Sequence, residues 1–117
     1  MNKIKFDLND RTAVITGGAQ GFGLDIAKRF LDSGANVIIW DIDPKMIEKA
    51  QKDLDNTNLS SNIVDVSNYK EVENCTKEIT KKTNIDILIN NAGITGPTAS
   101  LWEYDVEMWK KVVDINL

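Results

Sequence analysis

The fold is decided by one stretch, TGGAQGFG at residues 16–23. The residues just before it, TAVIT at 12–16, are apolar or β-branched and favour a strand. The residues after it carry apolar side chains three and four positions apart as far as Leu31, which predicts an amphipathic helix. Glycines between such a strand and helix allow a tight turn and let the backbone approach a pyrophosphate. A helix beginning near Gly21 would also direct its free N–H groups at those phosphates.

Three more strands are predicted at residues 36–40, 59–64 and 85–90, of which the one at 59–64 has the weakest signal. Within the strand at 36–40, residues 37–40 are continuously apolar, as expected of a strand that is buried on both faces. Helical stretches separate all four strands, so the strands should be parallel and joined by right-handed crossovers. We therefore expect an α/β fold with a Rossmann-type doubly wound parallel sheet. Because the last helix is still running at Leu117, we expect residues 1–117 to be the N-terminal part of one such domain, with the C-terminal half absent.

Capping residues mark the predicted helix boundaries. Gly34 would end the first helix in a left-handed conformation. Asp43 would cap the second helix and Pro44 would occupy its first position. Ser67 is placed to cap a third helix, and a fourth runs through residues 108–113. The tryptophans are interpreted as packing residues.

The composition excludes several classes of protein. The chain has 117 residues, 42% of them hydrophobic and 27% charged, which indicates one globular domain. Its net charge of −4, with no basic stripe, predicts no binding to nucleic acid. No apolar run could cross a bilayer and residues 1–7 lack a signal-peptide core, so we expect no membrane association and a cytoplasmic location. With no histidine and a single cysteine, Cys75, we expect no metal site, no histidine-based catalysis and no internal disulfide.

An acidic residue completes the glycine-rich motif at residues 16–23. Asp41 ends the second predicted strand, roughly 20 positions beyond the glycines, where a carboxylate can reach the hydroxyls of an adenosine ribose. The strand–turn–helix context together with this acid makes a nucleotide site a much stronger interpretation than a plain turn.

The chain resembles the short-chain dehydrogenase/reductase family. The resemblance rests on TGxxxGxG at residues 16–23, NNAG at 90–93, Asp65-Val66 after the third strand and Asn116 in the last helix. It covers the chain from about residue 10 onward. The amino-acid sequence of residues 93–104 is similar to that of 3-oxoacyl-(acyl carrier protein) reductase-like and sugar or polyol dehydrogenase members.

The resemblance implies the following phosphate and ribose contacts. The pyrophosphate would be lined by Gly17, Gly21 and Gly23, with Gln20 and Phe22 on the same loop. Asp41 would accept hydrogen bonds from the 2′- and 3′-hydroxyls of the adenosine ribose and would repel a 2′-phosphate. Neither Gln20 nor Ile42 is the cation that NADP-preferring relatives place there. NAD is therefore favoured over NADP.

The resemblance also implies an adenine site and one catalytic residue. Asp65 would accept from the adenine amino group and Val66 would pack on the ring. The wall beside the ribose would be formed by Asn91, Ala92 and Gly93, and Asn90 would brace the central strands. Asn116 resembles the asparagine of the family's Asn-Ser-Tyr-Lys tetrad, which steadies a proton-relaying water. Three plainer interpretations stay open: Asp41 as a helix-entry carboxylate, Asp65 as a turn residue and Asn116 as a helix-end asparagine.

The sequence departs from the family at the remaining catalytic residues. The family places tyrosine and lysine four residues apart, but Tyr69 is followed by Glu73 and Tyr104 by Met108. No counterpart of the fifth strand or of its serine is present. The chain should therefore not catalyse by itself, because no proton donor is matched to the alkoxide. A sheet ordered 3-2-1-4 would leave the fourth strand at an open edge, which favours a homo-oligomer.

Three hypotheses follow. In the first, the sequence is the N-terminal portion of an NAD-dependent oxidoreductase that transfers hydride between the nicotinamide and a small secondary alcohol or ketone. In the second, the chain is a module that binds NAD or another adenine nucleotide without turnover. In the third, it is an inert truncated product that does not fold stably alone.

Overall fold

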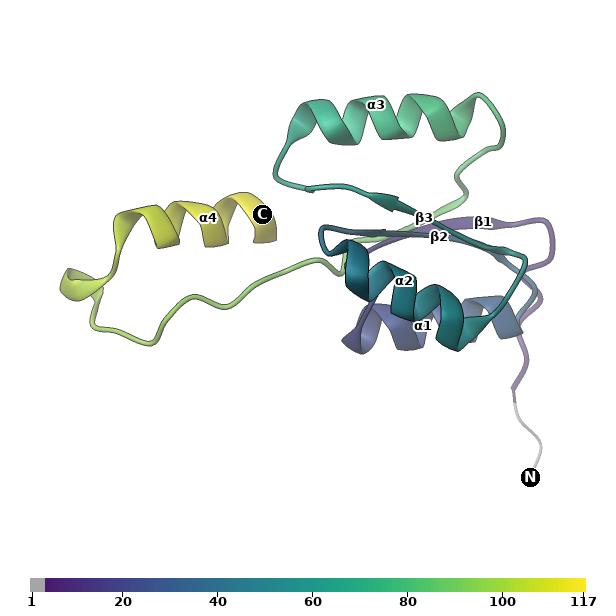
Figure 1. Ribbon diagram of the computed structural model, residues 1–117, viewed down its shortest axis with the longest axis horizontal. Helices are drawn as coiled ribbons and strands as arrows, with labels where there is room; N and C mark the ends of the chain where they lie inside the picture. The colour runs from purple at the N-terminus through teal and green to yellow at the C-terminus, as the bar shows by residue number, and fades with distance from the viewer. Residues whose placement is uncertain (1–3) are drawn as a thin grey trace.

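The structure, a computed structural model, describes residues 4–117, so the first three residues of the segment 1–7 considered for a signal peptide lie outside the described range. The chain alternates strands and helices as expected (Figure 1). In chain order the elements are β1 (Thr12–Thr16), α1 (Gly21–Asp32), β2 (Asn36–Asp41), α2 (Pro44–Leu54), β3 (Leu59–Ile63), α3 (Tyr69–Thr80), β4 (Ile87–Ile89), the 3-10 helix η1 (Leu101–Glu103) and α4 (Val106–Asn116).

The four strands form one parallel sheet in the order β3-β2-β1-β4, which confirms the predicted fold class. Helices α1 and α2 cover one face of the sheet and α3 covers the other, as Figure 1 shows. The long segment after β4 carries the chain away from the sheet to α4, which lies beside the layers rather than on either face (Figure 1).

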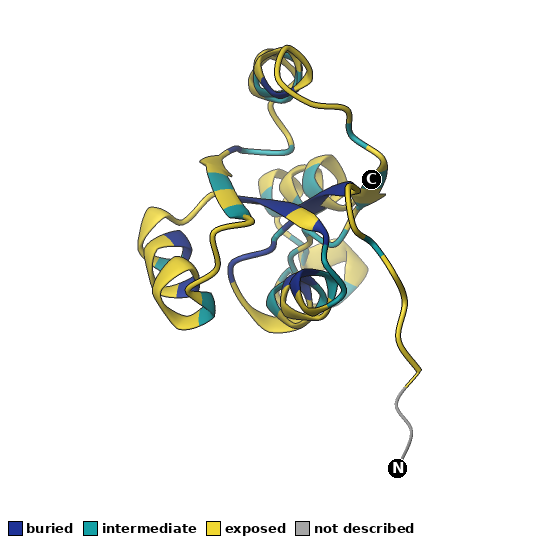
Figure 2. Cartoon of the chain, turned by 90° about the vertical axis from the view of Figure 1, so that its right-hand side faces the viewer, coloured by how far each residue is buried: buried dark blue, intermediate teal, exposed yellow. Residues whose placement is uncertain are grey.

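Two apolar clusters flank the central strand pair. Along β2 the side chains alternate: Ile39 packs with residues of α1 and α2, whereas Ile38 and Trp40 pack with Val64 and with Ile79 of α3. Figure 2 shows the resulting buried strands at the centre and exposed outer helix faces. This burial on both faces explains why residues 37–40 are continuously apolar. On the α3 side, burial raises the pKa of the Cys75 thiol.

Local capping chemistry sets the helix boundaries. Asp43 accepts from the backbone N–H groups of the first turn of α2, and Gly34 adopts φ +92° after α1, as predicted. The prediction for α3 is wrong: Asn68 is the N-cap, not Ser67. The N–H and hydroxyl of Ser67 instead both donate to Asp65 Oδ1, at 2.9 and 2.6 Å. Asp65 therefore forms an Asx turn that delays the start of the helix by one residue.

Strand β4 is three residues long, shorter than the predicted 85–90, and within the described residues it pairs only with β1. Asp86 does not extend the strand; its Oδ2 accepts from the N–H of Thr12 at 2.8 Å. Within residues 4–117 the far edge of β4 pairs with no strand, and Leu88 is 55% exposed. Helix α4 likewise exposes Val106 and Trp109. In this described range, no helix has the length and apolarity needed to cross a membrane.

Candidate functional site

The glycine-rich loop is held against the end of β2 by its own backbone. Gly17 and Gly21 adopt φ +63° and +58°, a region that other residues rarely occupy. The N–H of Gly18 donates to the Trp40 carbonyl at 3.3 Å, and the N–H of Ala19 donates to Asp41 Oδ2 at 3.2 Å. The turn between β1 and α1 is therefore fixed before any ligand enters.

The N-terminus of α1 is left open. Its N-cap, Gln20, makes no side-chain capping hydrogen bond in the described structure, and the first turn contains no acid. In contrast, Asn68 and Asp105 cap α3 and α4 with their side chains, and each of those helices has an acid in its first turn. A Cβ built on Gly21 would meet nothing within 4 Å. Free N–H groups, a positive dipole end and open space fit the phosphates of a nucleotide.

Asp41 lies at the tip of β2 and is 9% exposed. Its two oxygens accept from the N–H groups of Ala19 and Asp43, both at 3.2 Å. Each carboxylate oxygen can accept a second hydrogen bond, so the pair can still receive the two hydroxyls of a ribose. The same carboxylate thus orders the glycine loop and presents an acceptor beside it.

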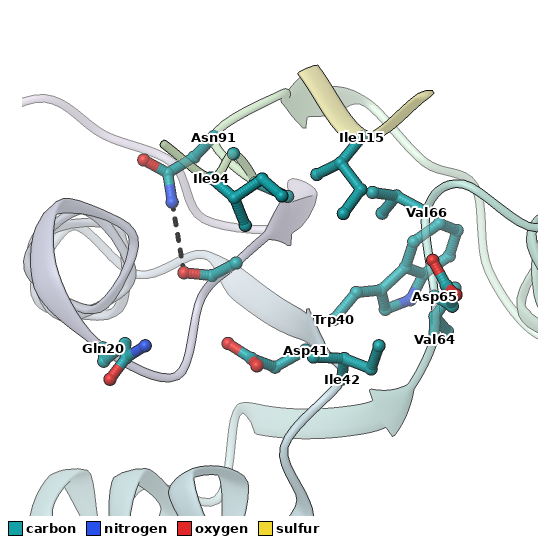
Figure 3. A pocket seen from close by; sticks show the side chains of 13 residues that line it. Gln20, Trp40, Asp41, Ile42, Val64, Asp65, Val66, Asn91, Ile94 and Ile115 are labelled. Carbon is teal, nitrogen blue, oxygen red and sulfur yellow. Dashed lines mark hydrogen bonds between the residues drawn. The ribbon is translucent and has the colours of Figure 1, made fainter. Parts of the chain in front are cut away.

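These elements enclose a pocket of about 280 Å³ (Figure 3). It joins the glycine loop, the ends of β2 and β3, and the segment after β4. The lining residues are Gly17, Gln20, Trp40, Asp41, Ile42, Val64, Asp65, Val66, Asn91, Ala92, Gly93, Ile94 and Ile115. Most of the residues predicted to contact a cofactor are therefore brought together. No lysine or arginine is among this lining from the described part of the chain, so its charged groups are the carboxylates of Asp41 and Asp65.

Some predicted residues lie outside the lining. Phe22 is 83% exposed, and Gly21 opens to solvent at the start of α1. Gly23 is buried behind the loop, where a Cβ would contact the Gly17 carbonyl oxygen and lie 2.6 Å from Asn91 Nδ2. Its part is to let the helix approach the loop closely.

The segment after β4 is tied to β1 through Asn91. Its Nδ2 donates to the carbonyls of Thr16 and Gly17, both at 3.1 Å. The Thr16 hydroxyl in turn accepts from the N–H groups of Asn91 and Ala92, both at 3.0 Å. The bracing role expected of Asn90 therefore belongs to Asn91, while Asn90 is exposed.

Four lining residues were not predicted as site residues: Trp40, Val64, Ile94 and Ile115. Trp40 was interpreted as a packing residue only. Because it directly precedes Asp41, a predicted site residue, the sequence could have indicated that Trp40 also lies at the pocket. Val64 and Ile94 directly adjoin the motifs at residues 65–66 and 90–93. Ile115 reaches the pocket only through the placement of α4, which no local signal gives.

Asn116 lies outside the lining but holds α4 to the site. Its Oδ1 accepts from the Ile94 N–H and its Nδ2 donates to the Ile94 carbonyl, both at 2.9 Å. Each end of the amide thereby makes one hydrogen bond to Ile94, which fixes the orientation of the side chain. The side chain acts as a clamp between α4 and the wall of the pocket.

We expect Asn116→Ala to release α4. No described residue of α4 is buried, so little else attaches this helix. Losing two hydrogen bonds at about 1 kcal/mol each should speed hydrogen exchange of the Ile94 amide roughly 30-fold, with little change in the global free energy of unfolding. Asp114→Ala, an exposed change in the same helix, is the matched control. Unchanged exchange at Ile94 in the Asn116 variant would contradict the clamp.

The arrangement is suited to binding and orienting a nucleotide. Neither tyrosine belongs to the pocket lining: Tyr69 is 78% exposed on α3, and Tyr104 packs edge-to-face on Trp109 with 6.0 Å between ring centroids. Among the described residues no group of three or more potential ligands is placed to hold a metal ion. The pocket therefore offers acceptors, backbone donors and apolar walls.

Comparisons with known proteins agree with this architecture. The chain is 37% identical over 108 residues to 2-dehydro-3-deoxy-L-rhamnonate dehydrogenase (NAD(+)) of Sphingomonas sp. (strain SKA58), covering 92% of this chain and 43% of that protein. It is 38% identical over 114 residues to the 3-oxoacyl-[acyl-carrier-protein] reductase FabG of Chlamydia muridarum (strain MoPn / Nigg), covering 94% of this chain and 46% of that one. The solved Pseudomonas aeruginosa RhlG/NADP active-site complex superimposes with a TM-score of 0.85 at 32% identity, covering 96% of this chain and 44% of that chain.

This chain thus spans less than half the length of these relatives. The family model described as short chain dehydrogenase matches residues 11–117, which include the glycine loop, Asp41 and the segment after β4. With the fold, the pocket and this match in agreement, the chain belongs to the short-chain dehydrogenase family.

Proposed function

We propose that residues 1–117 are the cofactor-binding portion of an NAD-dependent oxidoreductase acting on a small secondary alcohol or ketone. Bound NAD supplies a hydride acceptor at its nicotinamide ring. This chain's own residues bind and orient the adenosine diphosphate half of the cofactor. The observation that carries the proposal is Asp41, a nearly buried carboxylate fixed at the mouth of the glycine loop.

Charge favours NAD over NADP at this site. A 2′-phosphate on the ribose would meet the Asp41 carboxylate, and Gln20 and Ile42 beside it supply no cation. Bringing like charges together in a partly desolvated pocket costs more than the same approach in water. A free ribose diol would instead donate two hydrogen bonds to that carboxylate, which are among the stronger kinds.

We assign each of the other predicted residues a part in binding the cofactor or in the reaction. Gly17 and Gly21, with Gln20 and Phe22 on the same loop, lie where the pyrophosphate would meet the N-terminus of α1, and Gly23 allows the loop to pack. Asp65 and Val66 would hold the adenine, and residues 91–93 would line the ribose. Asn116 would steady the proton-relaying water, and its side chain fixes α4 to the pocket wall.

The chain supplies no paired tyrosine and lysine to protonate an alkoxide, so we propose that it binds cofactor without turnover by itself. A nucleotide-binding module without turnover is the alternative for the whole protein. The proposal also includes a homo-oligomer, supported by the exposed apolar residues of β4 and α4, and a cytoplasmic location, supported by the single free cysteine.

Asp41→Ala tests the proposal. We expect wild-type protein to bind NADH at least about tenfold more tightly than NADPH, and the variant to lose most of that preference, because about 1.4 kcal/mol of discrimination corresponds to a factor of ten. Titration calorimetry with both dinucleotides measures the ratio. The variant should also be less stable, because the Ala19 N–H loses its acceptor.

Asp43→Ala is the matched control. This carboxylate caps α2 two positions away, so its loss should lower stability by about 1 kcal/mol and leave the dinucleotide preference intact. A wild-type chain that binds neither dinucleotide would refute the proposal. Equal preference in wild-type and Asp41→Ala would remove Asp41 from the ribose site.

A further inference from the structure

Trp40 contains a buried donor without a partner. The residue is 4% exposed, and its Nε1 is the buried side-chain nitrogen or oxygen atom that lacks a hydrogen bond among residues 4–117. Leaving such a donor unpaired is costly, and folded proteins nearly always pair them. The indole also lines the nucleotide pocket.

An acceptor with spare capacity lies in the same pocket. Asp65 follows β3, and its Oδ1 accepts both hydrogen bonds from Ser67. The hydrogen bonds found within the described range leave Asp65 Oδ2 without a donor. Figure 3 shows the nitrogen-bearing edge of the Trp40 indole turned toward Asp65. An unpaired donor and an unpaired acceptor therefore border one wall of the pocket.

We propose that Trp40 is a specificity-determining positioning residue: its indole N–H binds Asp65 Oδ2 when a nucleotide enters and holds that oxygen toward the amino group of adenine. This inference rests on the proposed function, which supplies the adenine nucleotide. Ser67 fixes one oxygen of the carboxylate and Trp40 orients the other. A carboxylate held by these donors only accepts, so it pairs with a base that offers an amino hydrogen.

The consequence is discrimination between bases. Adenine offers a donor at its 6-position, whereas hypoxanthine offers a carbonyl oxygen that would face the carboxylate. A site built to pair a ligand N–H rejects an analogue that lacks it, because the buried partner is left unsatisfied. Trp40 would contribute to this selectivity without touching the amino group itself.

The test compares NADH with nicotinamide hypoxanthine dinucleotide in its reduced form, by titration calorimetry on the full chain. We expect wild-type protein to prefer NADH. Trp40→Phe keeps an aromatic ring and removes the N–H, and should reduce that preference about 3- to 10-fold, the equivalent of one hydrogen bond. Trp109→Phe, on α4 outside the pocket lining, should leave the preference unchanged.

The possible outcomes distinguish a failure of this inference from a failure of the proposed function. An equal loss for both dinucleotides would mean that Trp40 only packs, and would overturn the inference. An unchanged ratio would overturn it too. If wild-type protein binds neither dinucleotide, the proposed function fails and this inference fails with it. Binding with no base preference in the wild type overturns the inference alone.

A second measurement needs no change at Trp40. The Trp102→Phe/Trp109→Phe double variant leaves one indole N–H signal in the NMR spectrum, which belongs to Trp40. Saturating AMP should move this signal downfield, because the N–H gains an acceptor, and IMP should move it less. A signal that AMP does not move, or that AMP and IMP move equally, would overturn the inference.

Discussion

Gly23→Ala should destabilise the chain by about 2 kcal/mol or more and abolish dinucleotide binding. Two effects of opposite sign compete at this position. Alanine within α1 would gain about 1 kcal/mol in helix propensity over glycine. The added Cβ, however, would collide with the Gly17 carbonyl oxygen and lie 2.6 Å from Asn91 Nδ2. Overpacking of this kind costs about 1–3 kcal/mol, and displacement of Asn91 adds the loss of its two hydrogen bonds to the carbonyls of Thr16 and Gly17. The clash therefore outweighs the propensity.

Gly21→Ala is the matched comparison within the same loop. Its Cβ would meet nothing within 4 Å, so the only structural cost is the φ of +58°, about 1 kcal/mol. This variant should keep its fold but bind dinucleotide more weakly, since the methyl group enters the space left for phosphate. Chemical denaturation and calorimetry on both variants check these results. A Gly23→Ala chain as stable as the wild type would show that the loop is not closely packed.

The sequence predicted the fold well because its signals were local and redundant. The glycine loop, the Asp43-Pro44 start of α2 and the continuous apolar run of β2 each fix one element by short-range chemistry. Right-handed crossovers then make the strands parallel, and the order 3-2-1-4 is what the family resemblance implies. The errors fell where two local signals compete. Ser67 and Asn68 can both cap a helix, and the Asx turn at Asp65 decided for Asn68.

The motifs predicted most of the site residues. The residues that were missed are those that only tertiary packing brings to the pocket. Asp41, Asp65 and the segment after β4 were expected near the glycines, and one pocket collects them. Ile115 enters that pocket only because the Asn116 side chain clamps Ile94, a contact between segments 22 residues apart. Asn90 and Asn91 are neighbours of the same type, and only the geometry at the end of β4 shows which of them turns back to β1.

Thr16→Val should cost about 1–3 kcal/mol of stability and loosen the pocket wall. The residue is 5% exposed, and its hydroxyl accepts from the N–H groups of Asn91 and Ala92. Asn91 keeps a second acceptor, the Ile89 carbonyl at 3.1 Å, but the Ala92 N–H has no other partner in the described range. Valine matches threonine in shape, so the loss reports the hydroxyl rather than a cavity. Hydrogen exchange of the Ala92 amide measures the local effect.

Thr16→Ser separates the hydroxyl from the methyl group. It should lose about 0.8 kcal/mol for the missing methyl and keep slow exchange at Ala92, because the acceptor remains. NADH binding should weaken in the valine variant and persist in the serine variant, since residues 91–93 wall the pocket. If valine leaves Ala92 protected, the tie between β1 and the wall is made by Asn91 Nδ2 alone. The opposite result would mean that the buried Thr16 hydroxyl couples the central strand β1 to the wall of the nucleotide site, so that stability and cofactor binding fall together when it is removed.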